Sequence, residues 1–442
     1  MEEESPCSNF TAVILAGGNS NNFSFLTDTV PKPLIKLSGK SILHHLLHNL
    51  LSSGFKDLVI VTNKQAYSQV EEHAKCCISL LNQELIAQPS VSVYPVEDQG
   101  TTDVLNGLSA YVTRDFVVVP CDLYGPFDFK AFVNEHSRSS RLCTIALLDP
   151  THGSGSTGAK ATPKGGSSAS KGASSASAAA TSMNVCLGGN EYEDWSYKYK
   201  VVTTINEYNS CILGLVQQIA LDNGDPYELY KWHFPKNQKC VLRKNLVDLH
   251  VYAFSRLVFD VTTNESLLNS SIRMDLLPYV IKMQETPFLS NPHSTDKTWK
   301  LNDLHEDAHK VCYFLASGDN FKCCRINSVD TLYWANMQLC RKGLKKGKIK
   351  NAVLGNVNLN DTSEIKNSVI GDNVTIGNNV KITDCVVMDN CTIMDEAVLT
   401  KTFVGDSVVV ESRSNLKNVL VKSRSVVGQG TQLEKDYIPS FM

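Results

Sequence analysis

The segment Ile370-Gly-Asp-Asn-Val-Thr-Ile-Gly-Asn-Asn-Val-Lys381 holds two consecutive six-residue units of nearly the same pattern. Each unit begins with isoleucine, places valine four residues later, and carries glycine and asparagine where corners need a positive φ. The same beat continues in two interleaved apolar series: Ile370, Ile376, Ile382, Met388 and Met394, and Val374, Val380, Val386, Thr392, Val398, Val404, Val410 and Leu416. A coil that turns by about 120° every six residues stacks such side chains inside a triangular prism. The sequence therefore predicts a left-handed parallel β-helix of hexapeptide repeats over residues 346–442.

Two side-chain clusters resemble metal sites but are better explained by packing. Cys385 and Cys391 lie six residues apart in the repeats, and we expect them to stack in successive coils. His44, His45 and His48 have helical spacing, yet no acidic or cysteine ligand accompanies them, which favours a role on a helix face. The 14 cysteines are scattered along the chain, and we expect them to be reduced and structural.

Upstream of the repeats, short apolar runs alternate with helical stretches. The runs cover residues 11–15, 57–62, 116–120 and 143–148, and residues 41–53 form the clearest helix. Strands that alternate with helices predict a mixed or parallel sheet with crossover helices, so the fold class is α/β. The pattern resumes at residues 245–254, beyond a segment of mostly Gly, Ser, Ala, Thr and Lys at 151–183. We interpret that segment as a disordered insertion within one domain.

The sequence thus predicts two domains and their connection. The α/β domain covers residues 1–284, a polar linker 285–310, and a connecting hairpin and helix 311–345, before the β-helix domain at 346–442. In the connection, residues 311–315 and 322–326 are expected to form the hairpin and residues 330–342 the helix. A chain of 442 residues is long enough to bury two separate cores.

Charge and termini restrict the classes of partner. The chain has 42 Lys and Arg against 45 Asp and Glu, a net charge of -3, and so lacks the basic surface typical of nucleic-acid or anionic-membrane binding. Its acidic start does not have the pattern of a signal peptide, and no apolar run reaches the roughly 18 residues of a membrane span. We expect a cytosolic protein whose partners are proteins or small ligands.

The first apolar run leads into a glycine loop. The segment reads Leu15-Ala-Gly-Gly-Asn-Ser-Asn-Asn-Phe-Ser-Phe-Leu-Thr-Asp-Thr-Val-Pro-Lys-Pro33. It resembles the signature loop of the nucleotidyltransferases that join a sugar 1-phosphate to a nucleoside triphosphate, with matches at Ala16, Gly17, Gly18, Leu26, Thr27, Pro31, Lys32 and Pro33. The resemblance implies that backbone amides of the loop hold the nucleotide while its cations neutralise the triphosphate.

Two further segments resemble motifs of the same family. Gly100 and Thr101, in Gly100-Thr-Thr-Asp-Val-Leu105, correspond to the part that contacts the base, and Asp122, in Pro120-Cys-Asp-Leu123, to a carboxylate that holds Mg²⁺. The resemblance therefore implies a vestigial nucleotide-binding site formed by Ala16, Gly17, Gly18, Lys32, Gly100, Thr101 and Asp122. For Asp122 a structural capping role is the alternative, and for Lys32 the alternative is a solvated or loop-packing side chain.

The departures from the family pattern fall on its chemistry. Ser20 stands in place of a glycine and Asn22 in place of an arginine, and no Lys or Arg occurs between Gly17 and Pro31. A second metal carboxylate is not found in its expected sequence context between residues 251 and 281. Losing one pre-organised donor costs about 10²–10³ in rate. We therefore expect no catalytic residues, no metal site and no cofactor.

The order of these parts, together with residues 246–254 and 271–282, resembles the gamma subunits of translation initiation factor 2B. The resemblance implies a non-catalytic regulatory subunit of a heterodecameric guanine nucleotide exchange factor. Its partners would be the other subunits, especially a catalytic epsilon-type subunit, and its G-protein substrate would be initiation factor 2. Epsilon-type subunits carry a helical-repeat domain after the β-helix, whereas this sequence ends at Met442, which favours the gamma type. The alternatives are an active mannose- or glucose-1-phosphate nucleotidyltransferase and a sugar-nucleotide sensor.

Overall fold

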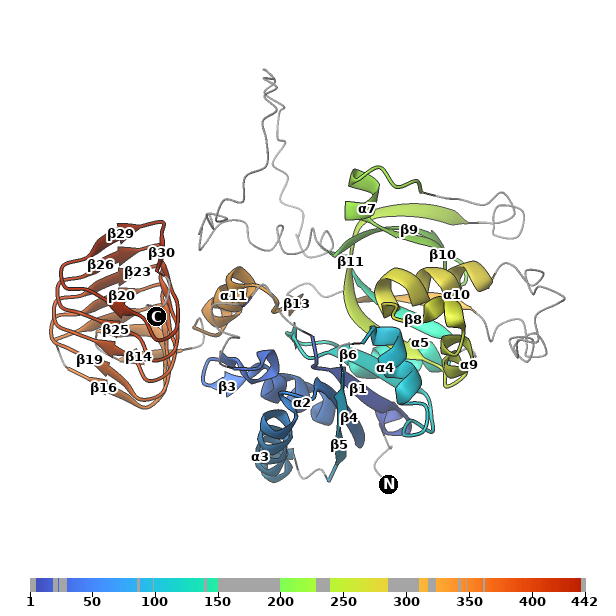
Figure 1. The fold of residues 1–442 in the computed structure, drawn as a ribbon, viewed down its shortest axis with the longest axis horizontal. Coiled ribbons are helices and arrows are strands. Elements are labelled where there is room, and N and C mark those ends of the chain that lie inside the picture. The colour runs from blue at the N-terminus through green and yellow to red at the C-terminus, as the bar shows by residue number, and fades with distance from the viewer. Residues whose placement is uncertain are drawn as a thin grey trace, which may run out of the picture.

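The computed structural model describes residues 5–18, 23, 30–85, 88–97, 99–138, 141–149, 199–227, 239–284, 310–316, 323–340, 343–346, 348–360 and 362–438. The insertion expected at 151–183 and residues 285–309 of the expected linker lie outside this part of the chain, as do Ser20 and Asn22. Figure 1 shows an α/β domain and a β-helix with helix α11 (Val329–Cys340) between them. The expected fold class, a mixed α/β domain followed by a parallel β-helix, is therefore confirmed.

A mixed nine-stranded sheet forms the centre of the N-terminal domain, in the order β5-β4-β1-β6-β11-β8-β12-β10-β9. The strands are β1 (Thr11–Leu15), β4 (Asp57–Asn63), β5 (Ser90–Val96), β6 (Phe116–Pro120), β8 (Cys143–Leu148), β9 (Lys200–Asn206), β10 (Cys211–Gln217), β11 (Cys240–Phe254) and β12 (Val311–Ala316). Strands β4, β1 and β6 run parallel, and β11 runs antiparallel to β6. The segments that follow β1 and β6 therefore emerge at one edge of the sheet, where α/β folds bind ligands.

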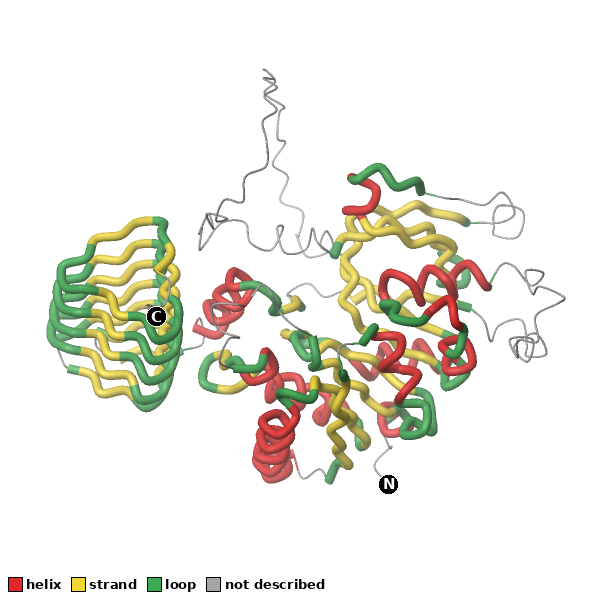
Figure 2. The backbone as a smooth tube through the Cα atoms, in the orientation of Figure 1, coloured by secondary structure: helices red, strands yellow, loops and turns green. Residues whose placement is uncertain are grey.

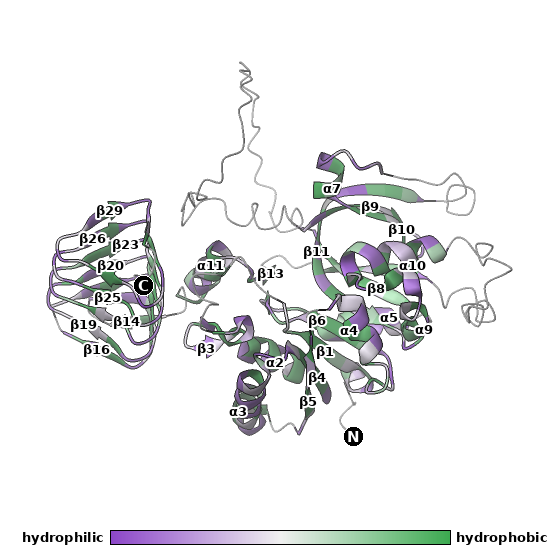
Figure 3. Ribbon diagram, viewed as in Figure 1, coloured by the Kyte–Doolittle hydropathy of each residue, from purple (hydrophilic) through white to green (hydrophobic). Residues whose placement is uncertain are grey.

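Helices cover both faces of this sheet. One core packs against α2 (Ile42–Ser53), α3 (Tyr67–Leu85) and α5 (Phe129–Ser137), and the other against α4 (Thr101–Gly107), α9 (Val258–Thr262) and α10 (Leu277–Met283). Neighbouring residues of β1 alternate between them, with Ile14 in the first core and Val13 in the second. The sheet strands accordingly carry mostly the hydrophobic colour in Figure 3. Within the described residues, no helix is long and apolar enough to cross a lipid bilayer.

Local sequence signals explain the helix that was expected at residues 41–53. The Ser41 side chain accepts a hydrogen bond from the backbone N–H of His44 at 3.0 Å and so caps the first turn of α2. Gly54 ends the helix with a φ of 99°, a conformation that favours glycine. Leu43, Leu46, Leu47 and Leu50 form the buried stripe with the spacing of one helix face.

The hairpin expected in residues 311–326 is not formed. Strand β12 joins the central sheet, where it runs parallel to β8 and pairs with β10 at one position. Strand β13 (Cys324–Arg325) instead pairs with β7 (Leu123–Tyr124), directly after Asp122. The local pattern of two short apolar runs could not reveal these partners, because all three partner strands lie far away in the sequence. We therefore assign β12 to the N-terminal domain.

The C-terminal domain is a parallel β-helix, with strands stacked coil upon coil (Figure 2). One face consists of β15 (Ile349–Leu354), β18 (Val369–Ile370), β21 (Val386–Val387), β24 (Phe403–Val404), β27 (Leu420–Val421) and β30 (Tyr437–Ile438). A second consists of β17 (Glu364–Lys366), β20 (Lys381–Thr383), β23 (Val398–Thr400), β26 (Asn415–Lys417) and β29 (Gln432–Glu434). The third consists of β16 (Val357–Leu359), β19 (Val374–Ile376), β22 (Thr392–Ile393), β25 (Val409–Val410) and β28 (Val426–Val427), and β14 (Leu344–Lys346) pairs with β15.

The expected six-residue repeat is wrong in detail. Residues that stack on one another in successive coils are 17 apart in the sequence, so one of the three sides of each coil has five residues. The buried interior series is Ile365, Ile370, Ile376, Ile382, Val387, Ile393, Leu399, Val404, Val410, Leu416, Val421 and Val427. Successive members of this interior series are five, six and six residues apart. The two series expected from the sequence, with a constant spacing of six, therefore lose alignment with the interior positions. Met394, expected inside, is 39% exposed, and Val386 is buried outside the prism against the N-terminal domain. Cys385 and Cys391 are buried in the interior but belong to one coil and do not stack on each other.

Asparagine supplies the expected corner conformation, whereas glycine serves another purpose. Asn373 and Asn379 have φ values of 56° and 54°, as expected for corners of the coil. Gly371 and Gly377 are absent from the residues with positive φ. A Cβ at Gly371 would lie only 2.8 Å from the carbonyl carbon of Met388 in the next coil. Glycine is therefore needed there for close approach between coils.

The two domains meet through α11 and one face of the β-helix. Leu332 and Tyr333 belong to the same buried cluster as Phe403 and Leu420. The Tyr333 hydroxyl also donates a hydrogen bond to the carbonyl oxygen of Asp384 at 2.7 Å. Beside this contact, Lys36 Nζ lies 2.5 Å from Asp389 Oδ2 and 3.1 Å from Asp372 Oδ2. Apolar burial and ion pairs thus both hold the β-helix against the N-terminal domain.

Candidate functional site

The glycine loop and Asp122 meet at the same edge of the sheet, as their positions after β1 and β6 predict. The backbone N–H of Ala16 donates to the carbonyl oxygen of Val61 at 2.7 Å, which ties the start of the loop to β4. A Cβ at Gly17 would lie 3.2 Å from the backbone nitrogen of Asn63, whereas Gly18 has open space around it. Gly18 is therefore exposed just beyond the end of β1.

Both carboxylate oxygens of Asp122 are engaged by cations. Arg325 binds with two bonds, Nε to Oδ1 at 2.8 Å and Nη2 to Oδ2 at 2.9 Å. Lys32 Nζ lies 2.5 Å from Oδ2, and the Asp122 side chain is only 1% exposed. Burial alone would raise the pKa of Asp122, but Arg325 and Lys32 outweigh it and hold the pKa at about 2. A bidentate arginine with a second cation fixes the carboxylate in its ionised form.

The surroundings of Asp122 and Lys32 distinguish between the roles expected for these two residues. Helix α5, which follows Asp122 most closely, is capped by Asp128, whose Oδ1 accepts the N–H of Ala131 at 2.9 Å. Asp122 is therefore an ion-pair partner and not the cap of that helix. Lys32 begins a short 3-10 helix (Lys32–Leu34) and is likewise an ion-pair partner.

A second buried carboxylate, Asp248, lies near the same arginine. Its side chain accepts hydrogen bonds from the N–H of His250 at 2.8 Å and from the Tyr252 hydroxyl at 2.9 Å, and Arg273 Nε lies 3.3 Å from Oδ2. The Asp248 side chain is fully buried, and burial raises its pKa despite these partners. The ladder between β11 and β8 shifts register between Asp248 and Tyr252, and His250 there has a φ of 58°.

This bulge joins the two carboxylates into one network. Arg325 Nη1 donates to His250 Nδ1 at 2.7 Å, and burial followed by the charge of Arg325 lowers the pKa of His250 far below its ordinary value. His250 is therefore neutral. The guanidinium groups of Arg325 and Arg273 lie 5.0 and 5.1 Å from the ring centroid of Tyr199. Three cations, with Lys32 the third, thus face two carboxylates, and both oxygens of Asp122 are paired with cations.

Gly100 and Thr101 pack against the segment that leads to Arg273. The Thr101 hydroxyl accepts the N–H of Ile272 at 2.9 Å, and Thr102 N donates to the carbonyl oxygen of Ser270 at 3.1 Å. A side chain at position 100 would collide with the backbone of residues 269–270, so glycine is required there. These contacts define a structural role for both residues in holding the segment that carries Arg273.

Sequence reasoning missed Arg325, Arg273, Asp248 and His250. The segments that contain Asp248 and Arg273 carried the family resemblance, but no pattern marked either side chain as part of the site. Arg325 lies 203 residues from Asp122 and was assigned to a hairpin. Ion pairs between remote segments have no periodic signal, so only the three-dimensional structure could reveal them.

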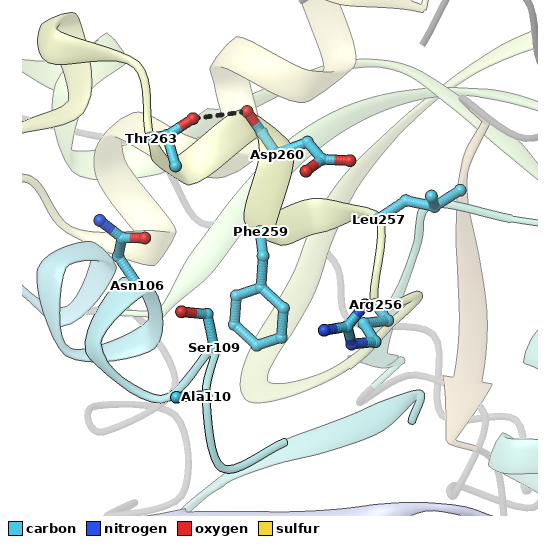
Figure 4. Close-up of a pocket in the computed structure, with 8 residues that line it drawn as sticks. All are labelled: Asn106, Ser109, Ala110, Arg256, Leu257, Phe259, Asp260 and Thr263. Atoms are coloured by element: carbon cyan, nitrogen blue, oxygen red, sulfur yellow. Dashed lines mark hydrogen bonds between the residues drawn. The ribbon is translucent and has the colours of Figure 1, made fainter. Parts of the chain in front are cut away.

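A cavity also lies elsewhere in the N-terminal domain. A cavity of about 360 Å³ between α4 and α9 is lined by residues that include Phe259, Arg256 and Asp260 (Figure 4). It lies near the start of β6, at the opposite edge of the sheet from Asp122, and contains none of the residues expected from the sequence. The described residues include no group of three or more His, Cys, Asp or Glu arranged for a metal ion. His45, from the histidine cluster, contacts the Leu37 carbonyl oxygen at 3.1 Å.

Comparison with known proteins matches both domains. The family model described as nucleotidyl transferase matches residues 11–155, and the one described as GMPPB C-terminal domain matches residues 353–438. The glucose-1-phosphate adenylyltransferase 2 of Vibrio parahaemolyticus is 30% identical over 148 residues, which cover 31% of this chain and 36% of that protein. The mannose-1-phosphate guanylyltransferase catalytic subunit beta of Drosophila melanogaster is 29% identical over 136 residues, which cover 31% and 36%.

One relative matches a much larger share of the chain. The translation initiation factor eIF2B subunit gamma of Schizosaccharomyces pombe is 23% identical over 343 residues. The match covers 74% of this chain, while the chain spans 64% of the fission yeast protein and about a third of the two transferases. The chain thus contains a nucleotidyl transferase domain, and over most of its length it is similar to the gamma subunit of translation initiation factor 2B.

Proposed function

We propose that the chain is a non-catalytic regulatory and scaffold subunit of the guanine nucleotide exchange factor that acts on translation initiation factor 2. In this proposal it works with an epsilon-type catalytic subunit in the cytosol and has no direct contact with nucleic acid or membrane. The long match to a gamma subunit supports a place in translation initiation. The observation that carries the non-catalytic role is the engagement of Asp122 by Arg325 and Lys32.

Arg325 and Lys32 would compete with a metal ion for Asp122. A metal ion at this carboxylate would need lone pairs that now accept hydrogen bonds from Arg325 and Lys32. Displacing Arg325, whose side chain is only 12% exposed, would leave a buried guanidinium without its carboxylate. Removing one partner of a buried pair costs about 3–5 kcal/mol, so separating Arg325 from Asp122 would oppose metal binding. A nucleotidyl transfer that depends on this carboxylate would therefore be strongly impaired.

The exchange role is tested by GDP release from initiation factor 2. We expect this chain alone to leave the release rate unchanged and to raise it when combined with an epsilon-type subunit. The three measurements use the partner alone, this chain alone and both together, at equal concentrations. A combination no faster than the partner alone would contradict the proposal.

A second candidate function is the transfer of a nucleotide to a sugar 1-phosphate. The nucleotidyl transferase match over residues 11–155 favours it, as do the two sugar-phosphate transferases among the relatives. Pyrophosphate release with mannose or glucose 1-phosphate, each nucleoside triphosphate and Mg²⁺ distinguishes the two functions. A rate within about tenfold of an active relative would overturn the non-catalytic proposal, because the lost electrostatic stabilisation should exceed that factor.

A further inference from the structure

We propose that the Asp122–Arg325 ion pair fastens the connector to the N-terminal domain and thereby fixes the position of the β-helix. The connector is defined as residues 323–340, which contain β13 and α11. The charged residues of the expected nucleotide site would then serve as an interdomain anchor. This inference rests on contacts within the chain and does not depend on a role in guanine nucleotide exchange.

The first end of the connector is bound directly to the residues around Asp122. Strand β13 pairs with β7 through Cys324 opposite Tyr124 and Arg325 opposite Leu123. The N–H of Ile326 then donates to the carbonyl oxygen of Asp122 at 2.8 Å. A ladder of two residues is too short to be stable by itself, so additional contacts must hold it.

Side chains supply those contacts. Arg325 makes two bonds to Asp122 and donates a third to His250. The side chains of Cys323, Cys324 and Ile326 are fully buried on either side of it. The ion pair is thus the charged centre of an otherwise apolar attachment, where an unpaired guanidinium would be costly.

The second end of the connector carries the β-helix. Helix α11 begins at Val329, four residues after Arg325, and Thr331 N donates to the Ser328 hydroxyl at 3.2 Å near its start. Its residues Leu332 and Tyr333 pack in one cluster with Val386, Phe403 and Leu420 on the β-helix face. A shift of β13 would therefore move α11 and with it the face on which the β-helix rests (Figure 1).

Lys36 offers a rival explanation for how the domains are held. It bridges Asp372 and Asp389 directly across the interface, without the connector. Its side chain is 38% exposed, so solvent screens these pairs more strongly than the buried Asp122–Arg325 pair. If the proposal is correct, removing the charge of Arg325 will loosen the domains more than removing the charge of Lys36.

The test measures the distance between the domains in the full chain. Two noncanonical residues at Ser52 in α2 and Lys417 in β26, both exposed, carry a fluorescent donor and acceptor. The variants are Asp122→Asn, Arg325→Met, their double variant and Lys36→Met. Arg243→Met is the matched control. Arg243 forms an ion pair with Glu207 at a distance of 3.0 Å, and neither residue belongs to the connector. Hydrogen exchange in β1, β4 and β6 reports whether the N-terminal domain is still folded.

We expect both single variants at the ion pair to broaden the distance distribution and to speed hydrogen exchange in residues 323–340 by about tenfold or more. The double variant should loosen the domains no further than either single one, while Arg243→Met should match the wild type. If Arg325→Met fails to fold, the double variant decides, since it removes the pair without leaving an unpaired aspartate or arginine. An unchanged distance distribution in a folded double variant would overturn the proposal.

Discussion

Asp122 and Asp248 illustrate how the partners of a buried carboxylate decide its ionisation. Both side chains are almost fully buried, which by itself favours the protonated form. Asp122 has a bidentate arginine and a lysine, and its pKa is lowered to about 2. Asp248 has one arginine atom at 3.3 Å, and burial raises its pKa despite that charge. Acid therefore weakens the contribution of Asp122 to the stability of the fold, whereas protonation relieves the cost of burying the charge of Asp248.

Asp122→Asn should destabilise the folded chain in a pH-dependent manner. The pKa of Asp122 falls from an ordinary value of 3.8 to about 2 on folding, so the ion pair stabilises the protein fully above pH 4. This contribution is lost as pH falls through the folded pKa. We expect a cost of about 3–5 kcal/mol at pH 7, because Arg325 loses its buried partner, and a smaller cost at pH 3. Urea denaturation of both proteins at pH 7, 5 and 3 measures the difference.

The contribution of Asp248 is common to wild type and variant, so it largely cancels in that difference. A cost of Asp122→Asn that stays constant from pH 7 to pH 3 would contradict the assigned pKa. Asn is the suitable replacement because it keeps the size of the side chain while removing the titrating group.

Cys211 and Cys312 are placed so that oxidation could join them in a disulfide. They lie directly opposite each other on β10 and β12, with their sulfur atoms 3.6 Å apart. Oxidation by diamide would join the two thiols in a disulfide and transfer their two hydrogens to the diamide. The hydrogen bond with Cys211 and burial raise the pKa of Cys312, so the reactive thiolate is scarce and oxidation should be slow in the native state.

We expect mild urea to accelerate the appearance of a peptide linked between these two cysteines, with a mass loss of about 2 Da from the two hydrogens. Peptide mapping by mass spectrometry measures it, and Cys211→Ser is the control. Faster cross-linking at the exposed Cys76 than at this pair would be consistent with slow oxidation of buried thiols. Absence of the linked peptide at every urea concentration would contradict the prediction.

At the scale of elements, the strands and helices followed from local patterns while their partners did not. The runs at β1, β6 and β8 were predicted to the residue, since each is a continuous apolar run ended by a turn signal. The six-residue repeat predicted the β-helix, but it did not predict that one side of each coil has only five residues. Two near-ideal units at 370–381 span the two six-residue steps, so they contain no sign of the shorter step. The pairing of β13 with β7, which brings Arg325 to the site, also had no local signal, because the two strands lie far apart in the sequence.

Val380→Asp and Val426→Asp test the assignment of inside and outside in the β-helix. Val380 is fully buried in the interior cluster, whereas Val426 is 46% exposed on the third face. Burying an unpaired charge costs several kcal/mol, so Val380→Asp should unfold the domain or lower its melting temperature strongly. Val426→Asp should change stability by no more than about 0.5 kcal/mol, as surface substitutions usually do. Thermal unfolding followed by circular dichroism measures both, and similar effects of the two changes would show that the assignment is wrong.

At the scale of the whole molecule, three contacts hold the domains in one arrangement. They are the ion pair at Asp122, the packing of α11 on the β-helix face, and the bridge from Lys36. A scaffold subunit acts through the relative position of its surfaces, so this arrangement matters more for the proposed function than the chemistry of the expected nucleotide site. The order of the two domains was predictable from sequence, whereas these contacts depend on side chains that come together only in the fold.

Arg325→Met should therefore weaken the proposed stimulation of nucleotide exchange, although the Arg325 side chain is largely buried. The Arg325 side chain is 12% exposed and lies among residues of its own chain, so a direct effect on binding is small. If the β-helix is no longer fixed relative to the N-terminal domain, the free chain adopts many domain orientations, most of which fit the epsilon-type subunit poorly. Binding must then select the fitting orientation, which weakens the apparent affinity. We expect the concentration needed for half-maximal stimulation of GDP release to rise about tenfold or more for Arg325→Met, and to stay within about twofold of the wild type for Arg243→Met. The maximal rate at saturation should be preserved, because bound chains regain the docked arrangement. If half-maximal stimulation is unchanged although the interdomain distances have broadened, the fixed arrangement of the domains is not used in exchange.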